Sequence, residues 1–114
     1  MLIMVQSRKR WTPEERTYVY NSCMGLCLIC GYPLDIDGFH MCHYVPFTEG
    51  GSDELTNIFA GCPSENESMG ALASFEYFVK RKHLTEWEAQ EASIAFEARV
   101  QQWRFYRGLT GGPR

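Results

Sequence analysis

Residues that can do chemistry are concentrated in the stretch FHMCHYVP, residues 39–46. His40, Cys42 and His43 lie within four positions there, just ahead of Pro46. Histidine acts as a general base near neutral pH without any adjustment, and cysteine and histidine are common ligands of zinc. Three interpretations of the stretch are therefore open: a catalytic site, a zinc site, or a chance grouping of these residues.

The cysteines favour a bound metal over disulfides. The chain has five of them, an odd number: Cys23, Cys27, Cys30, Cys42 and Cys62. In the first residues, MLIMVQSRKRW, the apolar run is too short for an export signal or a membrane span. We therefore expect a soluble cytoplasmic protein with reduced thiols.

A zinc knuckle is indicated by LCLICGYP, in which Cys27 and Cys30 form a C-x-x-C turn followed by glycine. Cys62 follows, and symmetry with the first half predicts a fourth ligand three residues later, where the chain has Glu65. His40 or Cys23 could supply that ligand instead. Without a metal, the three thiols would be buried as small apolar groups.

Helices are predicted on both sides of these residues. At the N-terminal end, Thr12 and Glu15 form a capping box around Pro13, which predicts a helix from about 13 to 24 that stops at Gly25. At the C-terminal end, Thr85 and Glu88 form a second capping box and predict a helix over about 85–107. Its apolar face is Ala89, Ala92, Phe96, Val100 and Trp103.

Two short strands are predicted in the middle of the chain. GFHMCHYVP reads as a strand that Pro46 ends, and TNIFAGC as a second strand after the polar loop FTEGGSDEL. One helix, or two joined near Gly70, follows from Pro63 at a first helical position and from apolar residues at Leu72, Phe75 and Val79. We therefore expect one α+β domain spanning residues 1–114, with its core at 23–80.

Charge is unevenly distributed along the chain. The net charge is only −3, which by itself gives no sign of nucleic-acid binding. Between Thr17 and Val79 the chain has no Lys or Arg, and it carries eight acidic residues there: Asp35, Asp37, Glu49, Asp53, Glu54, Glu65, Glu67 and Glu76. An acidic centre therefore lies between basic flanks.

The stretch HMCHYVPFTEGGSDELTNIFAGCPSENESMG, residues 40–70, resembles the HNH endonuclease family. The family pattern is an acidic residue and histidine on a first strand, a Gly-Gly loop, an asparagine at a second strand, and C-x-x-C-N at a helix start. The resemblance covers residues 27 to about 79 and includes the C-x-x-C-G lead-in. The spacing matches the HNH domains of CRISPR effector nucleases, with His43 lying 14 positions before Asn57 and 23 before Asn66.

The resemblance implies a small ββα-metal, treble-clef-like fold and a role for each matching residue. His43 would be the general base, Asn57 would orient the loop and the histidine, and Asn66 would bind a catalytic Mg²⁺ or Mn²⁺. Cys27, Cys30, Cys62 and Glu65 would hold a structural Zn²⁺. The reaction implied is hydrolysis of DNA to 5′-phosphate and 3′-hydroxyl ends, one strand at each active site.

The chain departs from the family pattern at two positions. The family has an acidic metal ligand just before the base, where this chain has Cys42, a soft ligand that suits zinc better than magnesium. Glu65 stands where the last zinc cysteine is usual. His40 remains open as a zinc ligand, a phosphate contact or a surface residue.

Contacts to DNA phosphates would have to come from the basic flanks. The candidates are Lys80, Arg81, Lys82, Arg104 and Arg107, with the Arg99 to Arg107 face as a whole. We expect DNA as the partner, no membrane, and a homodimer or larger nucleoprotein complex where both strands are cut. The alternatives are a catalytically inactive HNH fold that binds DNA or protein, and a redox or metal sensor using Cys42 and the knuckle.

Overall fold

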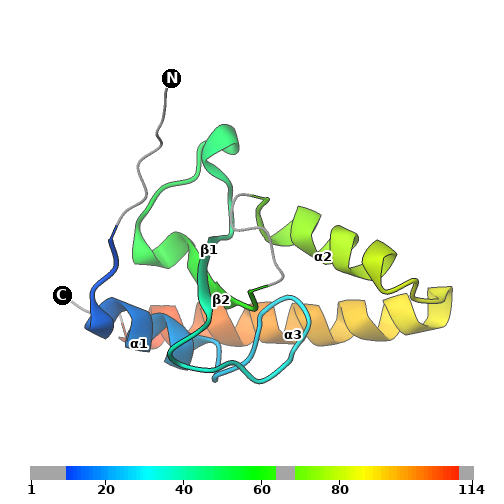
Figure 1. The fold of residues 1–114 in the computed structure, drawn as a ribbon, viewed down its shortest axis with the longest axis horizontal. Coiled ribbons are helices and arrows are strands. Elements are labelled where there is room, and N and C mark those ends of the chain that lie inside the picture. The colour runs from blue at the N-terminus through cyan, green and yellow to red at the C-terminus, as the bar shows by residue number, and fades with distance from the viewer. Residues whose placement is uncertain (1–9, 64–68, 111–114) are drawn as a thin grey trace.

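The computed structural model describes residues 10–63 and 69–110. In these residues the chain is a small α+β fold of three α-helices and a two-stranded antiparallel sheet (Figure 1). The elements in chain order are α1 (Pro13–Ser22), β1 (His40–His43), the 3₁₀ turns η2 (Phe47–Glu49) and η3 (Leu55–Asn57), β2 (Ile58–Gly61), α2 (Ala71–Arg81) and α3 (Glu86–Thr110). The sheet lies in the middle, α3 runs along the length of the molecule, and α1 and α2 lie towards its two ends.

Helix α1 begins as predicted. The Thr12 hydroxyl accepts a hydrogen bond from Glu15 N–H at 3.1 Å, and the Glu15 carboxylate accepts one from Thr12 N–H at 2.9 Å. The helix ends at Ser22, two residues before the predicted end at residue 24, because Met24 and Gly25 both have left-handed backbones with φ of 57° and 72°. Gly25 N–H closes the end by donating to the carbonyl of Tyr20 at 2.9 Å.

The predicted hairpin is confirmed. Strands β1 and β2 pair antiparallel, with Cys42 opposite Phe59 and His43 opposite Ile58. All four residues of β2 are buried, which fits the run of apolar residues IFAG. The strand β1 ends at His43, and the backbone beyond it joins the loop that leads to η3.

Helix α2 differs from the prediction in its start and in its buried face. It begins at Ala71 after Gly70, and Pro63 lies in a turn, while residues 64–68 lie outside the described part of the chain. Leu72, which we expected on the apolar face, is 63% exposed. Ala71 and Ser74 are the buried residues of the helix instead, while Phe75 packs against the core as predicted and stacks on Phe96 with ring centroids 4.6 Å apart.

Helix α3 follows its predicted capping box, with Glu88 N–H donating to the Thr85 hydroxyl at 3.1 Å, and it continues three residues past the predicted end at Arg107. Its predicted inner face is confirmed, since Phe96, Val100 and Trp103 are all buried. None of the helices in the described residues is both long and apolar enough to cross a membrane.

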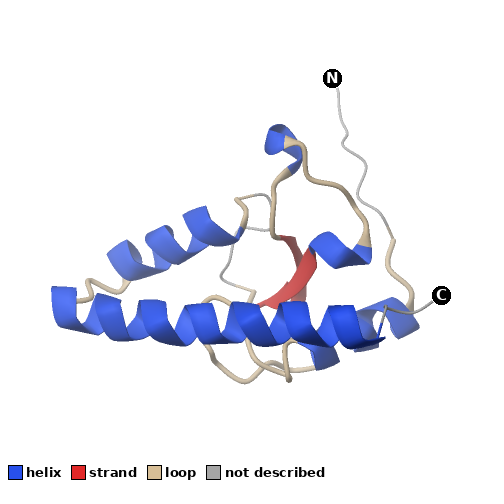
Figure 2. Cartoon of the chain, turned by 180° about the vertical axis from the view of Figure 1, so that it is seen from behind, coloured by secondary structure: helices blue, strands red, loops and turns tan. Residues whose placement is uncertain are grey.

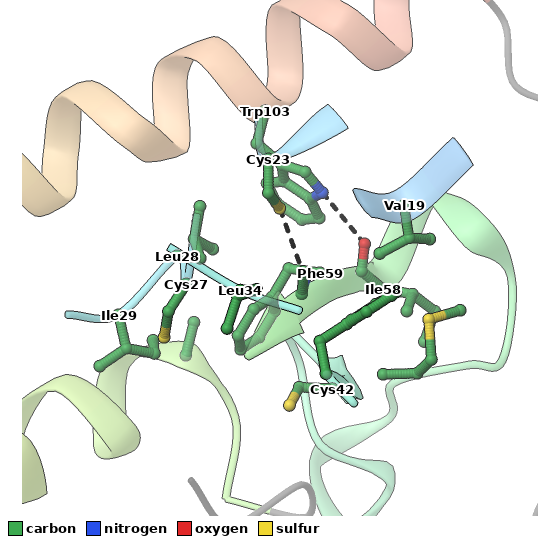
Figure 3. Close-up of a cluster of buried hydrophobic side chains, with 14 of the residues drawn as sticks. Val19, Cys23, Cys27, Leu28, Ile29, Leu34, Cys42, Ile58, Phe59 and Trp103 are labelled. Carbon is green, nitrogen blue, oxygen red and sulfur yellow. Dashed lines mark hydrogen bonds between the residues drawn. The ribbon is translucent and has the colours of Figure 1, made fainter. Parts of the chain in front are cut away.

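Trp103 joins α3 to the hairpin. Its indole N–H donates to the carbonyl of Ile58 at 3.0 Å, and its ring stacks on Tyr44 with centroids 5.0 Å apart. Figure 3 shows this bond beside a second one, in which the Ala60 N–H donates to the Cys23 sulfur at 3.4 Å. The end of α1, the strand β2 and α3 therefore share one core.

Candidate functional site

Three cysteines predicted as zinc ligands converge in space. The Sγ atoms of Cys27, Cys30 and Cys62 all lie within 4.8 Å of one another, and those of Cys30 and Cys62 are 3.8 Å apart. Among the described residues this is the one group of three or more Cys, His, Asp or Glu side chains with metal-binding geometry. The cluster could bind a metal ion such as zinc.

The knuckle that presents the first two thiolates is held by backbone hydrogen bonds. Cys27 N–H donates to the carbonyl of Tyr32 and Gly31 N–H donates to the carbonyl of Cys27, both at 2.8 Å. Leu28 N–H donates to Ala60 in β2 at 3.0 Å. The turn is thus attached to the strand that leads into Cys62, which explains how cysteines 32 positions apart in sequence meet.

Arg99 of α3 holds the same turn from its other side. Its guanidinium donates to the carbonyls of Leu28 at 2.8 Å and Ile29 at 2.9 Å. Gly31 makes room for it, because a Cβ at Gly31 would lie 2.8 Å from an Arg99 nitrogen, and its φ of +82° also favours glycine. Arg99 is thus occupied by the knuckle and does not belong to the predicted DNA-contact face.

The cluster stabilises a thiolate even without a metal. Hydrogen bonding from Cys30 lowers the pKa of Cys27 to about 5, against the opposing effect of burial. The same contact raises the pKa of Cys30, and burial adds to this rise. The cluster therefore favours negative charge on Cys27, as the binding of a cation requires.

The predicted fourth zinc ligand lies outside the described residues. Glu65, the predicted ligand, and Asn66, the predicted catalytic metal ligand, both fall in residues 64–68, outside the described part of the chain. Cys23, the alternative, is a core thiol hydrogen-bonded by Ala60 N–H, and burial raises its pKa to about 11. His40 is half-buried on β1 and is not part of the cysteine group.

His43, the predicted base, is paired with an acidic side chain that the sequence did not single out. Its Nε2 lies 2.8 Å from Oδ1 of Asp53, with the His43 side chain 17% exposed. Because an ionised carboxylate only accepts hydrogen bonds, Nε2 of His43 is the donor in this pair. The pair therefore fixes both the tautomer and the direction of the ring.

Asn57 holds the loop between His43 and Asp53. Its Oδ1 accepts from Val45 N–H at 2.9 Å, and its Nδ2 donates to the carbonyls of Val45 at 3.0 Å and Ser52 at 2.8 Å. Gly51 lies inside this loop, where an added Cβ would come within 1.8 Å of the Val45 oxygen. A single amide thus closes residues 45–57 into a defined loop beside the histidine.

Helix α2 begins at the same end of the hairpin. Ala71 N–H donates to the carbonyl of Tyr44 at 3.0 Å, and Gly70 packs against Pro46 so closely that a Cβ there would lie 2.7 Å from the ring. The start of α2 is thereby fixed next to the residue that follows His43.

Cys42 is not part of the metal-binding group found among the described residues. It is 1% exposed, its sulfur lies 3.7 Å from the carbonyl oxygen of His40, and Figure 3 shows it among the core side chains. Consecutive strand residues point to opposite faces of a sheet, so Cys42 and His43 diverge. The thiol is a core residue in the described part of the chain.

The predicted DNA contacts fall into two groups. Lys80, Arg81 and Lys82 are exposed at the end of α2. Arg104 is exposed and lies over the ring of Tyr44, next to His43, with 5.4 Å between its guanidinium and the ring centroid. Arg107 is instead packed on Trp103 at 4.0 Å, and burial lowers its pKa.

Two residues of these sites escaped the sequence analysis. In the sequence, Asp53 was counted only as one of the acidic residues of the centre. The one signal that could have singled it out as a partner of His43 was its place in the Gly-Gly loop that Asn57 closes. Arg99 bonds a turn 70 positions away in sequence, and no local pattern marks it.

Comparison of the chain with family models, with curated proteins and with solved structures finds no match. Function is therefore inferred from the residues and contacts themselves.

Proposed function

We propose that the chain is a metal-dependent DNA endonuclease that nicks one strand with His43 as the general base. The observation that supports this proposal is the loop closed by Asn57, which places Asp53 against the Nε2 of His43 at 2.8 Å. A histidine whose ring is oriented by a carboxylate is an arrangement typical of a general base that activates water.

The fold type we propose is a ββα-metal fold of treble-clef type. Its support is the order of elements, in which the C-x-x-C knuckle precedes the hairpin β1–β2 and α2 starts at the hairpin end beside His43. A structural zinc on Cys27, Cys30 and Cys62 fits the cluster geometry, with Glu65 as the proposed fourth ligand.

A catalytic divalent metal is part of this proposal, and the described residues fit it only in part. A soft, buried thiol at Cys42 does not suit Mg²⁺, so the proposal assigns the Mg²⁺ or Mn²⁺ to Asn66. The metal would supply stabilisation of the charge on the phosphate and on the leaving 3′ oxygen. His43 would hold the attacking water and accept its proton, and Asp53 would keep the imidazole aligned.

Phosphate contacts would come from the two exposed basic groups. Arg104 is exposed on α3 and lies over the ring of Tyr44, so it is one candidate contact for a backbone phosphate. Lys80, Arg81 and Lys82 would extend the contact along α2.

Plasmid relaxation tests the proposal directly. Wild-type protein with Mg²⁺, Mn²⁺ or Ni²⁺ should convert supercoiled DNA to nicked circles that accumulate before any linear product. A ligase should reseal the nicks, as 5′-phosphate and 3′-hydroxyl ends require. His43→Ala should abolish nicking, and the matched change at an exposed histidine, His83→Ala, should leave it intact. Equal activity of wild type and His43→Ala in every metal would overturn the proposal.

A second candidate function is DNA binding by an inactive fold. It is favoured by Cys42, which puts a buried thiol where the resemblance calls for an acidic ligand. Under this alternative, wild type and His43→Ala bind DNA equally in a gel-shift assay and neither nicks it.

A further inference from the structure

Tyr44 lies where several parts of the fold meet. It directly follows His43, the last residue of β1, and it leads into the loop that Asn57 closes. Its N–H donates to the carbonyl of Asn57 at 2.8 Å, and its carbonyl accepts from Ala71 N–H at 3.0 Å. The backbone of this residue therefore ties the end of β1 both to the residue before β2 and to the first turn of α2.

The ring of Tyr44 is held by two other aromatic side chains. It stacks on Trp103 of α3 with centroids 5.0 Å apart and an angle of 21° between the planes, and it lies edge-to-face with Phe59 of β2 at 6.4 Å. Phe59 and Trp103 are in edge-to-face contact with each other at 6.4 Å. Aromatic rings favour both arrangements, so α3 and β2 together fix the side chain of the residue next to the proposed base.

Trp103 also holds the strand opposite His43. Its indole N–H donates to the carbonyl of Ile58 at 3.0 Å, and Ile58 is the residue of β2 that pairs with His43. Figure 2 shows the two strands beside α3. A single side chain of α3 thus holds the ring of Tyr44 on one side of this strand pair and the backbone of Ile58 on the other.

The hydroxyl of Tyr44 has a weaker contact than the ring. It lies 3.5 Å from Nη2 of Arg104, which is longer than an ordinary hydrogen bond. The contacts that fix Tyr44 therefore come from its ring and its backbone, and phenylalanine would keep both.

We propose that Tyr44 is a positioning residue for the His43–Asp53 pair and acts through its stack on Trp103. The two members of the pair are joined by one contact of 2.8 Å, and they come from the two sides of Tyr44 in the chain, His43 from the strand end and Asp53 from the loop. A smaller side chain at position 44 would leave a gap beside Trp103 into which the strand end can move. A displacement of about 1 Å at a reacting group can slow a reaction about 100-fold. The effect on nicking rests on the proposed nuclease function, whereas the effect on the pair itself does not.

Nitrogen NMR of the neutral His43 ring tests the positioning without DNA. The wild type should show one tautomer, with the proton on Nε2 beside Asp53. Tyr44→Leu should show a mixture of the two tautomers and faster exchange of the Ala71 amide proton, and Tyr44→Phe should match the wild type. Tyr44→Met, whose flexible side chain fills irregular gaps, is measured beside Tyr44→Leu and should change in the same direction if the leucine variant does not fold. Wild-type tautomer and exchange in the folded variants overturn the proposal, whether or not the protein cuts DNA.

Plasmid nicking gives the second readout. Tyr44→Leu should lower kcat roughly 10- to 100-fold with KM nearly unchanged, and Tyr44→Phe should restore the wild-type rate. The matched control is Tyr18→Leu, which removes a ring contact at 5.5 Å between α1 and Tyr106 of α3. It should lower the melting temperature but leave kcat and the His43 tautomer unchanged.

Two results in the nicking assay contradict positioning by the ring. An equal loss of kcat in Tyr18→Leu would make the effect one of general stability, and an equal loss in Tyr44→Phe would assign it to the phenol. A wild-type protein that nicks no DNA refutes the proposed function instead, and the tautomer and amide exchange then decide whether Tyr44 positions the pair.

Discussion

Asp53 illustrates how one side chain can decide what its neighbour does. The His43 imidazole has two nitrogens with different roles, and the carboxylate 2.8 Å from Nε2 assigns the proton to that side. Without it the ring could rotate and exchange tautomers. The proposed base is therefore better described as a His43–Asp53 pair than as a lone histidine.

Replacing Asp53 should reduce turnover without weakening DNA binding. We expect Asp53→Ala to lower kcat for plasmid nicking roughly 10- to 100-fold, part of what a general base contributes, with KM nearly unchanged because Asp53 acts by orienting His43. Asp53→Asn should recover part of the loss, since an amide oxygen still accepts from Nε2. Glu54→Ala removes the same charge from the next, exposed residue and should have little effect; an equal loss there would mean that only the loop charge matters.

Cys42→Asp measures whether position 42 can reach a metal. A carboxylate placed at this 1% exposed site should cost roughly 3 kcal/mol or more of unfolding free energy unless a cation pairs with it. If the side chain meets the proposed catalytic metal, Mg²⁺ should raise the melting temperature of Cys42→Asp more than that of the wild type, and should increase nicking. If Mg²⁺ raises the melting temperatures of Cys42→Asp and of the wild type by the same amount, position 42 lies outside the metal shell.

At the scale of elements, the site depends on a loop and a turn rather than on the helices and strands themselves. The loop 45–57 is closed by the Asn57 amide, and the knuckle is clamped between β2 and Arg99. The knuckle is also anchored by the buried side chains of Leu28 and Ile29, whereas the loop depends mainly on its hydrogen bonds.

The paired glycines of the loop should respond differently to the same substitution. Gly51→Ala forces a Cβ to within 1.8 Å of the Val45 oxygen, so the loop must open, at a cost of about 3 kcal/mol and with loss of nicking. Gly50→Ala meets no atom within 4 Å and should cost only about 1 kcal/mol, for its left-handed φ of +90°. Urea unfolding of both variants checks the difference, and equal costs would contradict the described loop.

Arg99→Lys should loosen the knuckle although the charge is kept. Lysine cannot bond both carbonyls with the geometry of the guanidinium fork, so we expect a loss of roughly 1.5–3 kcal/mol in unfolding free energy and faster transfer of zinc to a chelator. Arg104→Lys, an exposed change on the same helix, is the control for stability and zinc transfer. Unchanged zinc transfer in Arg99→Lys would show that the knuckle does not need the clamp.

The parts of the fold that follow local rules could be predicted from the sequence. Both capping boxes, the inner face of α3 and the C-x-x-C turn depend on residues three or four positions apart, and the two strands of the hairpin are each recognisable from their own apolar residues and from the turn residues between them. The phase of α2 could not be predicted, because the small residues Ala71 and Ser74, rather than Leu72, pack inwards. Arg99 and Asp53 could not be singled out either, since their partners are set by tertiary packing and by loop closure.

At the scale of the whole molecule, the cysteine cluster joins parts that the chain otherwise connects only through long loops. Cys27 and Cys30 follow α1, whereas Cys62 follows β2, and the described apolar core is small. A metal at this point would close a long loop of backbone, which gives it a large effect on stability.

Removing the metal should therefore affect the entire fold. We expect a chelator, or Cys62→Ser, to lower the melting temperature by more than about 10 °C and to release one zinc per chain in a colorimetric assay. Cys23→Ser is the matched control, because its sulfur lies outside the cluster and an oxygen can still accept from Ala60 N–H. Full zinc content in Cys62→Ser would contradict the proposed ligand set.

The clamp by Arg99 and Trp103 also sets the order in which the protein can mature. The carbonyls of Leu28 and Ile29 in the knuckle and the carbonyl of Ile58 accept hydrogen bonds from α3, which follows all three in the chain. A nascent chain that already contains the knuckle and the hairpin thus lacks the side chains that secure them, and these long-range contacts form late. The knuckle and the hairpin would then gain these three hydrogen bonds only once α3 has folded against them.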